Sequence, residues 1–264
     1  MRPSPLNYIR PHSVRDALVA AHESSDGAVY LAGGQDLLPS LNRGDRSPSL
    51  VVDLKGALDL GVSPAGPQWL GIGALTTHHQ LSQAHASRSW SDAVSELGPL
   101  PVRTRATVGG HLAAGAPGDF WPTLLTALDG RVELVELGGR RLVAVAEALS
   151  AVRRGHGLVC GVLLPRSNDL VGVSRTRGYT PAANAMPRLT CAIRIVPDSA
   201  RRVADARVVI GGANPPRRLT LVEAALLDRR VNALTGDIPP TPFGALVGRA
   251  LHGLGRHSRD EEHL

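Results

Sequence analysis

Cysteine is nearly absent from this sequence, since Cys160 and Cys191 are the only two among 264 residues. Two thiols so far apart fit neither a disulfide framework nor the clustered thiolates of a zinc or iron–sulfur site. Any redox chemistry of the chain must therefore come from an organic cofactor or from a partner chain.

Aromatic residues are also scarce, at 3% of the chain, although the formal net charge is +6. The arginines that carry much of this charge occur as scattered doublets, such as Arg153-Arg154 and Arg229-Arg230, and form no single basic stripe. Few side chains are available for nucleic-acid bases to stack on. The composition therefore argues against nucleic-acid binding.

Long apolar runs are missing as well. No stretch reaches the roughly 18 apolar residues that a membrane span needs, and the start of the chain, residues 1–7, lacks the apolar core of a signal peptide. We therefore expect no membrane segment and a cytoplasmic location. Lysine occurs once, as Lys55, so that no glycine cluster is followed by the lysine of a P-loop.

The first two thirds of the sequence alternate between helix and strand patterns. Ser13 can cap a helix whose apolar residues Val14, Ala17 and Leu18 recur at helical spacing, before a strand at 28–32. The further elements expected are strands at 50–54, 69–75, 131–137 and 157–165, and helices from Thr76-Thr77 to about 87, at 91–97 and at 120–130.

The pattern changes near residue 170. Three strand-like runs, 170–179, 189–196 and 206–212, are joined by polar segments, which predicts an antiparallel sheet. Helical patterns follow at 219–230 and 243–253. Together these elements predict an α+β domain at the C-terminus.

Two glycine pairs follow short apolar runs. "GGQD" occupies residues 33–36, and "TVGGH" occupies residues 107–111. Without Cβ atoms, such loops let the backbone turn with positive φ, and their N–H groups can also point together at an anion. Each loop alone can be an ordinary turn, whereas both together could face one ligand that carries two phosphates.

Several motifs in a fixed order point to one family. They are "YIRPHS" (8–13), "LAGGQDLLPSL" (31–41), "VVDL" (51–54), "LGIGALTTH" (70–78), "VRTRATVGGHLA" (102–113), "PTLLTALDGRVEL" (122–134) and "IGGANPPRR" (210–218). As a set, which extends over nearly the whole chain, they resemble the FAD-binding medium subunit of molybdenum hydroxylases. This family includes the flavoprotein subunits of carbon monoxide dehydrogenase and xanthine dehydrogenase.

The resemblance implies an α+β fold with two domains. Residues 1–169 would form a FAD-binding domain of the vanillyl-alcohol-oxidase or PCMH type, built from two α/β subdomains at about 1–55 and 56–169. Residues 170–264 would form a smaller α+β C-terminal domain with an antiparallel sheet, which covers one side of the flavin.

The resemblance also implies a set of residues that bind the cofactor FAD. The first loop would contribute Ala32, Gly33, Gly34, Gln35, Asp36 and Leu37; the second loop would contribute Thr107, Gly109, Gly110, His111, Ala116 and Asp119; Arg177 and Tyr179 would lie near the isoalloxazine ring. Both loops would donate hydrogen bonds to the pyrophosphate, mainly through the backbone. The alternative interpretation, which the residues alone favour, is that Arg177 and Tyr179 are plain strand-surface residues.

Other residues near these loops permit several interpretations. Arg103 and Arg105 match basic residues of the family, and they can orient the second loop, balance phosphate charge or lie on a solvated surface. The histidines His78, His79 and His85 have no evident carboxylate support, so no metal site is expected. The sequence assigns no catalytic residue.

The second loop departs from the family pattern, which usually reads T-[IV]-G-G-N-[LI]-A-N-[AG]-[SD]-P-x-x-D. His111 and Ala114 replace the two asparagines, Ala116 replaces the Ser or Asp, and Phe120 occupies the acidic position. Asp119 lies one residue early. These changes put several side-chain hydrogen bonds to FAD in doubt, whereas hydrogen bonds from the backbone could remain.

The resemblance implies a flavoprotein subunit that passes electrons through FAD. Its partners would be a molybdopterin large subunit and a [2Fe–2S] small subunit, with an external electron acceptor. The altered segment at 111–120 leaves open a stand-alone FAD-dependent enzyme that tailors a small molecule. A flavin-free scaffold, in which the loops have lost their ligand, is the third alternative.

Overall fold

A computed structural model places the elements of the chain. It describes residues 6–24, 27–57, 59–61, 66–84, 93–95, 97–115, 120–155, 157–166, 170–176, 189–211 and 215–230. These residues fall into two units. The first unit comprises 1–83, 97–114 and 131–164, and the second comprises 84–96, 115–130 and 165–264.

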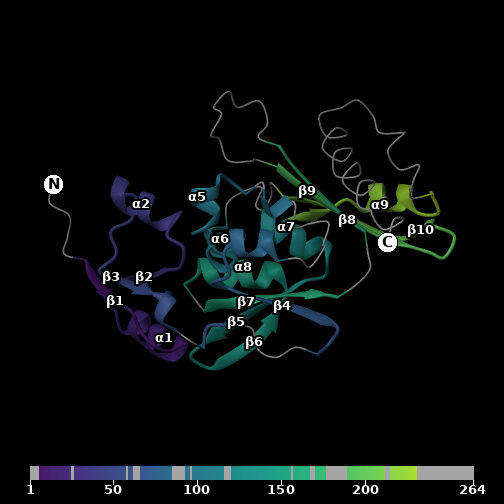
Figure 1. Cartoon of the computed structure of the whole chain (residues 1–264). Coiled ribbons are helices and arrows are strands. Elements are labelled where there is room, and N and C mark those ends of the chain that lie inside the picture. The colour runs from purple at the N-terminus through teal and green to yellow at the C-terminus, as the bar shows by residue number, and fades with distance from the viewer. Residues whose placement is uncertain are drawn as a thin grey trace. The chain divides into compact units, whose positions relative to one another are not determined.

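The first unit begins with a small parallel sheet (Figure 1). Its strands are β1 (Asn7–Ile9), β3 (Leu50–Asp53) and β2 (Ala28–Leu31), in that order, and both outer strands run parallel to β3. The helix α1 (Val14–Glu23) precedes β2, α2 (Leu37–Arg43) follows it, and the short 3₁₀ helix η1 (Leu54–Gly56) follows β3.

The helix α1 forms as its sequence predicts. The Ser13 hydroxyl oxygen accepts a hydrogen bond from the Asp16 N–H at 3.1 Å, which caps the first turn. The residues Val14, Ala17 and Leu18 are buried, because positions three and four apart lie on one helical face.

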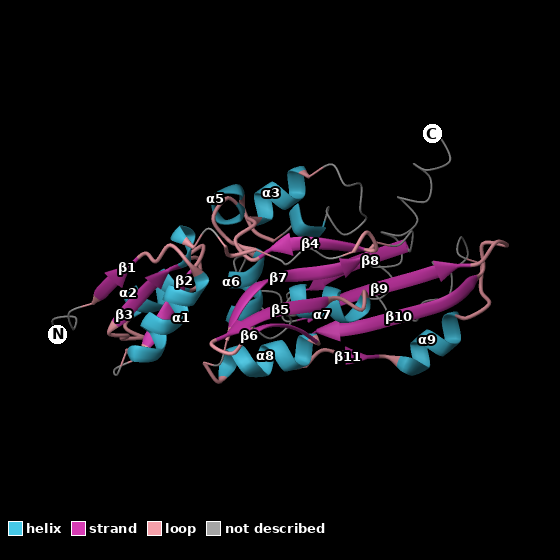
Figure 2. Ribbon diagram, turned by 90° about the horizontal axis from the view of Figure 1, so that it is seen from below, coloured by secondary structure: helices cyan, strands magenta, loops and turns pink. Residues whose placement is uncertain are grey.

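A second sheet of the first unit has the order β4-β7-β5-β6, and Figure 2 shows these strands side by side. Its strands are β4 (Trp69–Gly73), β7 (Leu158–Pro165), β5 (Arg131–Glu136) and β6 (Gly139–Val143). The helices of this part are α3 (His78–Gln83), α5 (Leu100–Arg103), α6 (Val108–Ala114) and α8 (Val145–Arg153). The strand β7 is buried from Leu158 to Leu164, as expected for a strand covered on both faces.

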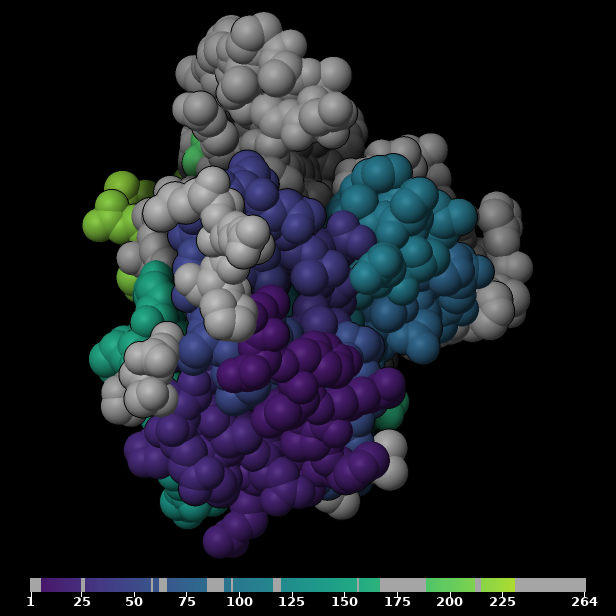
Figure 3. Space-filling view, turned by 90° about the vertical axis from the view of Figure 1, so that its left-hand side faces the viewer, coloured from purple at the N-terminus to yellow at the C-terminus, as the bar shows by residue number. Residues whose placement is uncertain are grey.

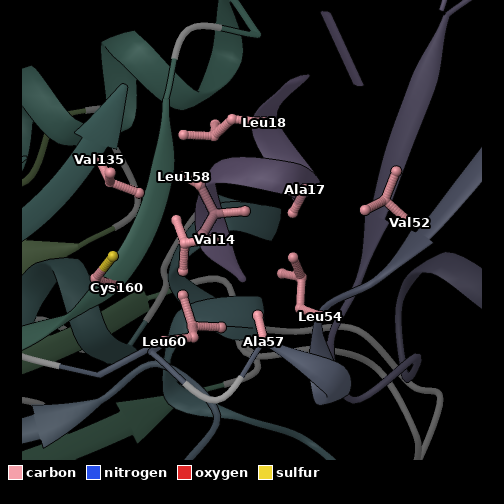
Figure 4. Packing of buried hydrophobic residues seen from close by; sticks show 10 residues of the cluster. All are labelled: Val14, Ala17, Leu18, Val52, Leu54, Ala57, Leu60, Val135, Leu158 and Cys160. Atoms are coloured by element: carbon pink, nitrogen blue, oxygen red, sulfur yellow. The ribbon is translucent and has the colours of Figure 1, made fainter. Parts of the chain in front are cut away.

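One apolar cluster joins the two sheets of the first unit (Figure 4). Val14 and Leu18 of α1 pack between Val52 of the parallel sheet and residues of the second sheet, including Leu158 and Cys160. The first glycine pair directly follows β2, and the second glycine pair contacts Ala74, the residue after β4.

The second unit is built on an antiparallel sheet, as predicted. Its order is β11-β10-β9-β8, with strands β8 (Leu170–Thr176), β9 (Leu189–Pro197), β10 (Val203–Gly211) and β11 (Arg217–Arg218). The helices α7 (Phe120–Ala127) and α9 (Thr220–Leu226) pack against it. Because α7 is almost wholly buried and contacts β9 and β10, residues 115–130 belong to this unit.

Some elements differ from the sequence expectations. The helix α3 ends at Gln83, short of residue 87. Of the helix expected at 91–97, residues 93–95 are helical, and the helix expected at 243–253 lies outside the described residues. The strand β6 and the helix α8 were not anticipated.

Both cysteines are free buried thiols. Burial raises the pKa of Cys160 to about 11 and the pKa of Cys191 to about 12. Neither thiol therefore supplies a reactive thiolate at neutral pH.

A buried carboxylate ties α9 to β10. Glu223 accepts hydrogen bonds from the Arg218 guanidinium at 2.7 and 3.1 Å and from the Val208 N–H at 3.0 Å. Burial alone would raise the pKa of Glu223, but the hydrogen bonds from Arg218 and Val208 hold it below its usual value. The ionised form is therefore the one that the fold stabilises.

We predict that Glu223→Gln lowers the free energy of unfolding by about 1–3 kcal/mol, because an amide cannot accept both arginine hydrogen bonds. A depressed folded-state pKa contributes stability above the unfolded-state pKa, and this contribution is lost as the pH falls through the folded-state value. Urea denaturation at neutral and at acidic pH measures the effect. The difference between the two proteins should shrink on acidification.

Glu147→Gln is the matched control, since Glu147 is an exposed glutamate that also pairs with an arginine, Arg141. An exposed pair contributes about 0–1 kcal/mol. Equal destabilisation by both substitutions would show that the buried carboxylate has no special role.

Candidate functional site

The first glycine pair lies in the turn between β2 and α2. Gly34 has a φ of 76°, which glycine adopts without the steric cost of a Cβ atom. Leu37 is buried below this turn, and the Leu38 N–H donates to the Gly34 carbonyl at 3.0 Å. The segment 32–36 therefore forms a fixed loop, which we call the first loop.

The second glycine pair lies in the first turn of α6 and not in an open loop. The Gly109 N–H donates to the Ala74 carbonyl at 2.9 Å, and the Val108 N–H donates to the Thr76 carbonyl at 3.0 Å. A Cβ on Gly109 would lie 2.5 Å from the Cβ of Ala74. This glycine lets α6 pack directly on the segment that follows β4.

The two glycine segments meet backbone to backbone. A Cβ on Gly33 would lie 2.0 Å from the carbonyl oxygen of Arg105 and 3.1 Å from the Cα of Ala106. A Cβ on Gly110 would lie 3.5 Å from the Cβ of Ala32. In Figure 3 the indigo surface around β2 and α2 adjoins the blue-teal surface around α5 and α6. The structure thus brings Ala32, Gly33 and Gly110 together.

The two segments differ in their available hydrogen-bond donors. In α6, the Gly110 N–H donates to the Thr107 hydroxyl at 3.1 Å, and the His111 N–H donates to the Thr107 carbonyl at 2.9 Å. Within the described part of the chain, the N–H groups of residues 33–36 donate to no other protein group. The first loop therefore carries the amides that can bind an anion.

A charged network lies against the first loop. The Lys55 ammonium donates to the Ala32 carbonyl at 3.2 Å and pairs with the Asp53 carboxylate at 2.6 Å. The Tyr8 hydroxyl donates to the other oxygen of Asp53 at 2.5 Å. Burial alone would raise the pKa of Asp53, but hydrogen bonds from Lys55 and Tyr8 hold it below its usual value.

The sequence analysis did not identify this network. The signal available was that the only lysine directly follows the "VVDL" motif.

Arg103 orients the segment that leads to the second glycine pair. Its guanidinium donates to the Gly98 carbonyl at 3.0 Å and to the Ser82 hydroxyl at 3.4 Å. The Arg105 side chain is exposed, whereas its carbonyl oxygen faces Gly33. Of the roles open to Arg103, the contacts thus support loop orientation.

The departures from the family pattern fall in two different environments. His111 lies against the buried His78, with 3.4 Å between His111 Nδ1 and His78 Nε2. Phe120 is fully buried in α7 and packs edge-on against Trp121, with ring centroids 5.2 Å apart. The phenylalanine is thus a core residue of the second unit.

Four of the expected cofactor-binding residues lie outside the described residues. They are Ala116, Asp119, Arg177 and Tyr179. His85 also lies outside them, and the described residues contain no group of three His, Cys, Asp or Glu side chains that could hold a metal ion.

Residues 4–167 match the family model described as the FAD binding domain in molybdopterin dehydrogenase. The chain is 29% identical over 254 residues to the caffeine dehydrogenase subunit beta of a Pseudomonas species, covering 90% of this chain and 84% of that protein. It is 32% identical over 152 residues to the carbon monoxide dehydrogenase medium chain of Afipia carboxidovorans, covering 56% and 52%.

A solved structure supports the fold. A chain of carbon monoxide dehydrogenase from Hydrogenophaga pseudoflava matches with a TM-score of 0.79 at 23% identity, covering 97% of this chain and 99% of that chain. The protein therefore belongs to the family of FAD-binding domains in molybdopterin dehydrogenases. It is an FAD-dependent oxidoreductase of the flavoprotein-subunit type, and its electrons pass through FAD.

We predict that Gly33→Ala weakens FAD binding at least tenfold, because the new methyl group would collide with the Arg105 carbonyl and separate the two glycine segments. Titration of FAD into the apoprotein by flavin fluorescence measures the affinity, and thermal melting checks the fold.

Gly138→Ala is the control, since a Cβ there meets no atom within 4 Å. Unchanged FAD affinity in a folded Gly33→Ala protein would contradict the assigned contact.

Proposed function

We propose that the first loop and the start of α6 hold the pyrophosphate of FAD. The observation that carries this proposal is the contact of Gly33 with the Arg105 carbonyl, beside amides that donate to no group in the described ranges. Converging N–H groups without Cβ atoms allow phosphate oxygens to approach closely. The amide donors of the first loop therefore suit the phosphate oxygens of the cofactor that this family binds.

The residues of the two glycine segments have different roles in this proposal. The amides of Gly33, Gly34, Gln35 and Asp36 donate to phosphate oxygens, and buried Leu37 supports the loop from below. Thr107 accepts from the Gly110 N–H, which leaves its hydroxyl hydrogen to donate toward the cofactor. Gly109 and Gly110 act through the absence of a side chain. His111, Ala116, Asp119, Arg177 and Tyr179 complete the proposed cofactor-binding set.

Similar proteins are described as a subunit and a medium chain, which supports a place for this protein in a larger complex. Bound FAD accepts one or two electrons, so that it can connect one-electron carriers with a two-electron acceptor. An iron–sulfur cluster needs more thiolates than the two buried cysteines of this chain provide. We therefore propose partners that carry the molybdopterin and the [2Fe–2S] clusters, and an external electron acceptor.

The proposed domains are residues 1–169 for FAD binding, with subdomains at about 1–55 and 56–169, and residues 170–264 for the C-terminal domain. The family model ends at residue 167, close to the proposed boundary, whereas the second compact unit also takes in residues 84–96 and 115–130.

We further propose a cytoplasmic location. Its support is that both cysteines are free thiols, as is usual in reducing compartments. No helix in the described ranges is long and apolar enough to cross a membrane.

We predict that the isolated chain binds FAD but oxidises no substrate until its partner subunits are added. Co-expression with neighbouring genes for molybdopterin and [2Fe–2S] subunits should yield a complex in which substrate reduces this FAD. The measurement is flavin bleaching under anaerobic conditions, with the isolated chain as the control. Substrate turnover by the isolated chain would identify a stand-alone flavoenzyme instead.

A further inference from the structure

The charge of Lys55 is held by a buried carboxylate beside the first loop. It lies in η1, directly after β3, and its ammonium is held by the Asp53 carboxylate at 2.6 Å. Asp53 is itself 3% exposed and anchored on its other oxygen by Tyr8. The backbone N–H of Lys55 also donates to Asp53, at 3.0 Å. The ammonium is therefore held in place on a buried anchor.

The second contact of the ammonium reaches the first loop. Lys55 Nζ donates to the carbonyl oxygen of Ala32 at 3.2 Å. This carbonyl shares a peptide plane with the N–H of Gly33. Because C=O and N–H point in opposite directions across a trans peptide, fixing one orients the other. A cation on the carbonyl oxygen also draws electron density from the peptide and makes its N–H a stronger donor.

We propose that Lys55 is the positioning residue of the pyrophosphate site, and that it orients and polarises the Ala32–Gly33 peptide. The proposal rests on the assignment of the first loop to the FAD pyrophosphate. Lys55 acts through the peptide and through its charge, so its role differs from that of a residue that only supports the fold. Tyr8 and Asp53 serve this role by holding the ammonium against the carbonyl.

The test compares Lys55→Met and Lys55→Arg with the wild-type chain. Lys55→Met keeps the length of the side chain and removes its charge, and we expect FAD affinity to fall about tenfold, as for the loss of a charge-assisted contact. Lys55→Arg retains a cation that can reach the Ala32 carbonyl oxygen and the Asp53 carboxylate. We expect this variant to keep most of the wild-type affinity for FAD. Fluorescence titration with FAD gives the dissociation constants, and thermal melting of the apoproteins confirms that each variant is folded.

Arg43→Met is the control, because it removes one positive charge from the far end of α2, where Arg43 pairs with Asp45. FAD affinity should stay within about twofold of wild type in this variant. Competition with ADP, which carries a pyrophosphate but no flavin, gives a second readout. ADP affinity should fall by a similar factor in Lys55→Met.

The outcomes separate this inference from the assignment of the loop. If Lys55→Met binds FAD and ADP like wild type while Gly33→Ala does not, the role of Lys55 is overturned and the loop assignment stands. If Lys55→Arg binds FAD as weakly as Lys55→Met does, the proposal that a positive charge orients the peptide is overturned. If both Lys55→Met and Gly33→Ala bind normally, the loop is not the pyrophosphate site and both proposals fail.

Discussion

The close approach of Gly33 to the Arg105 carbonyl is the contact on which the proposed site depends. It joins the loop after β2 of the parallel sheet to the segment between α5 and α6, which is hydrogen-bonded to the residues that follow β4 of the second sheet. Only a residue without a Cβ fits there, since an added Cβ would lie 2.0 Å from a backbone oxygen. The packing of α1 residues between Val52 and Leu158 joins the two sheets of this unit. The first loop is thereby held with amides for which the described residues provide no acceptor.

The four glycines of the two pairs meet three different structural requirements. Gly34 supplies a positive φ, Gly33 and Gly109 permit backbone contact, and Gly110 fits beside Thr107 and Ala32. The amides in the first turn of α6 already donate to protein acceptors. The two segments therefore contribute differently to the proposed site. The first loop provides hydrogen-bond donors, and the start of α6 provides a surface without side chains at Gly109 and Gly110.

Much of the fold could be predicted from the sequence, because the local sequence patterns favour the same elements that the tertiary packing stabilises. The cap at Ser13, the strands that became β2, β3, β4, β5 and β7, and the antiparallel sheet of the second unit were all predicted correctly. The strand β6 escaped prediction because its sequence, "GRRLV", lies at a sheet edge and lacks an apolar alternation. The helix α8 did carry apolar residues at helical spacing, so that its signal was present and overlooked.

The parts of the site that escaped prediction depend on contacts between distant segments. No local pattern shows that Lys55 reaches back to Ala32, or that the second glycine pair begins a helix that packs on Ala74. Phe120 aligned with an acidic family position, yet it is a core residue because α7 packs into the sheet of the second unit. Motif order was sufficient to identify the family, whereas the role of each residue required the three-dimensional arrangement.

The most direct test of the central claim is a crystal structure of the chain with FAD bound. Our account predicts the pyrophosphate oxygens within hydrogen-bond distance of the amides of Gly33, Gly34 and Gln35, with the Gly33–Arg105 contact intact. A pyrophosphate bound elsewhere, or a first loop whose amides face away from the cofactor, would contradict it.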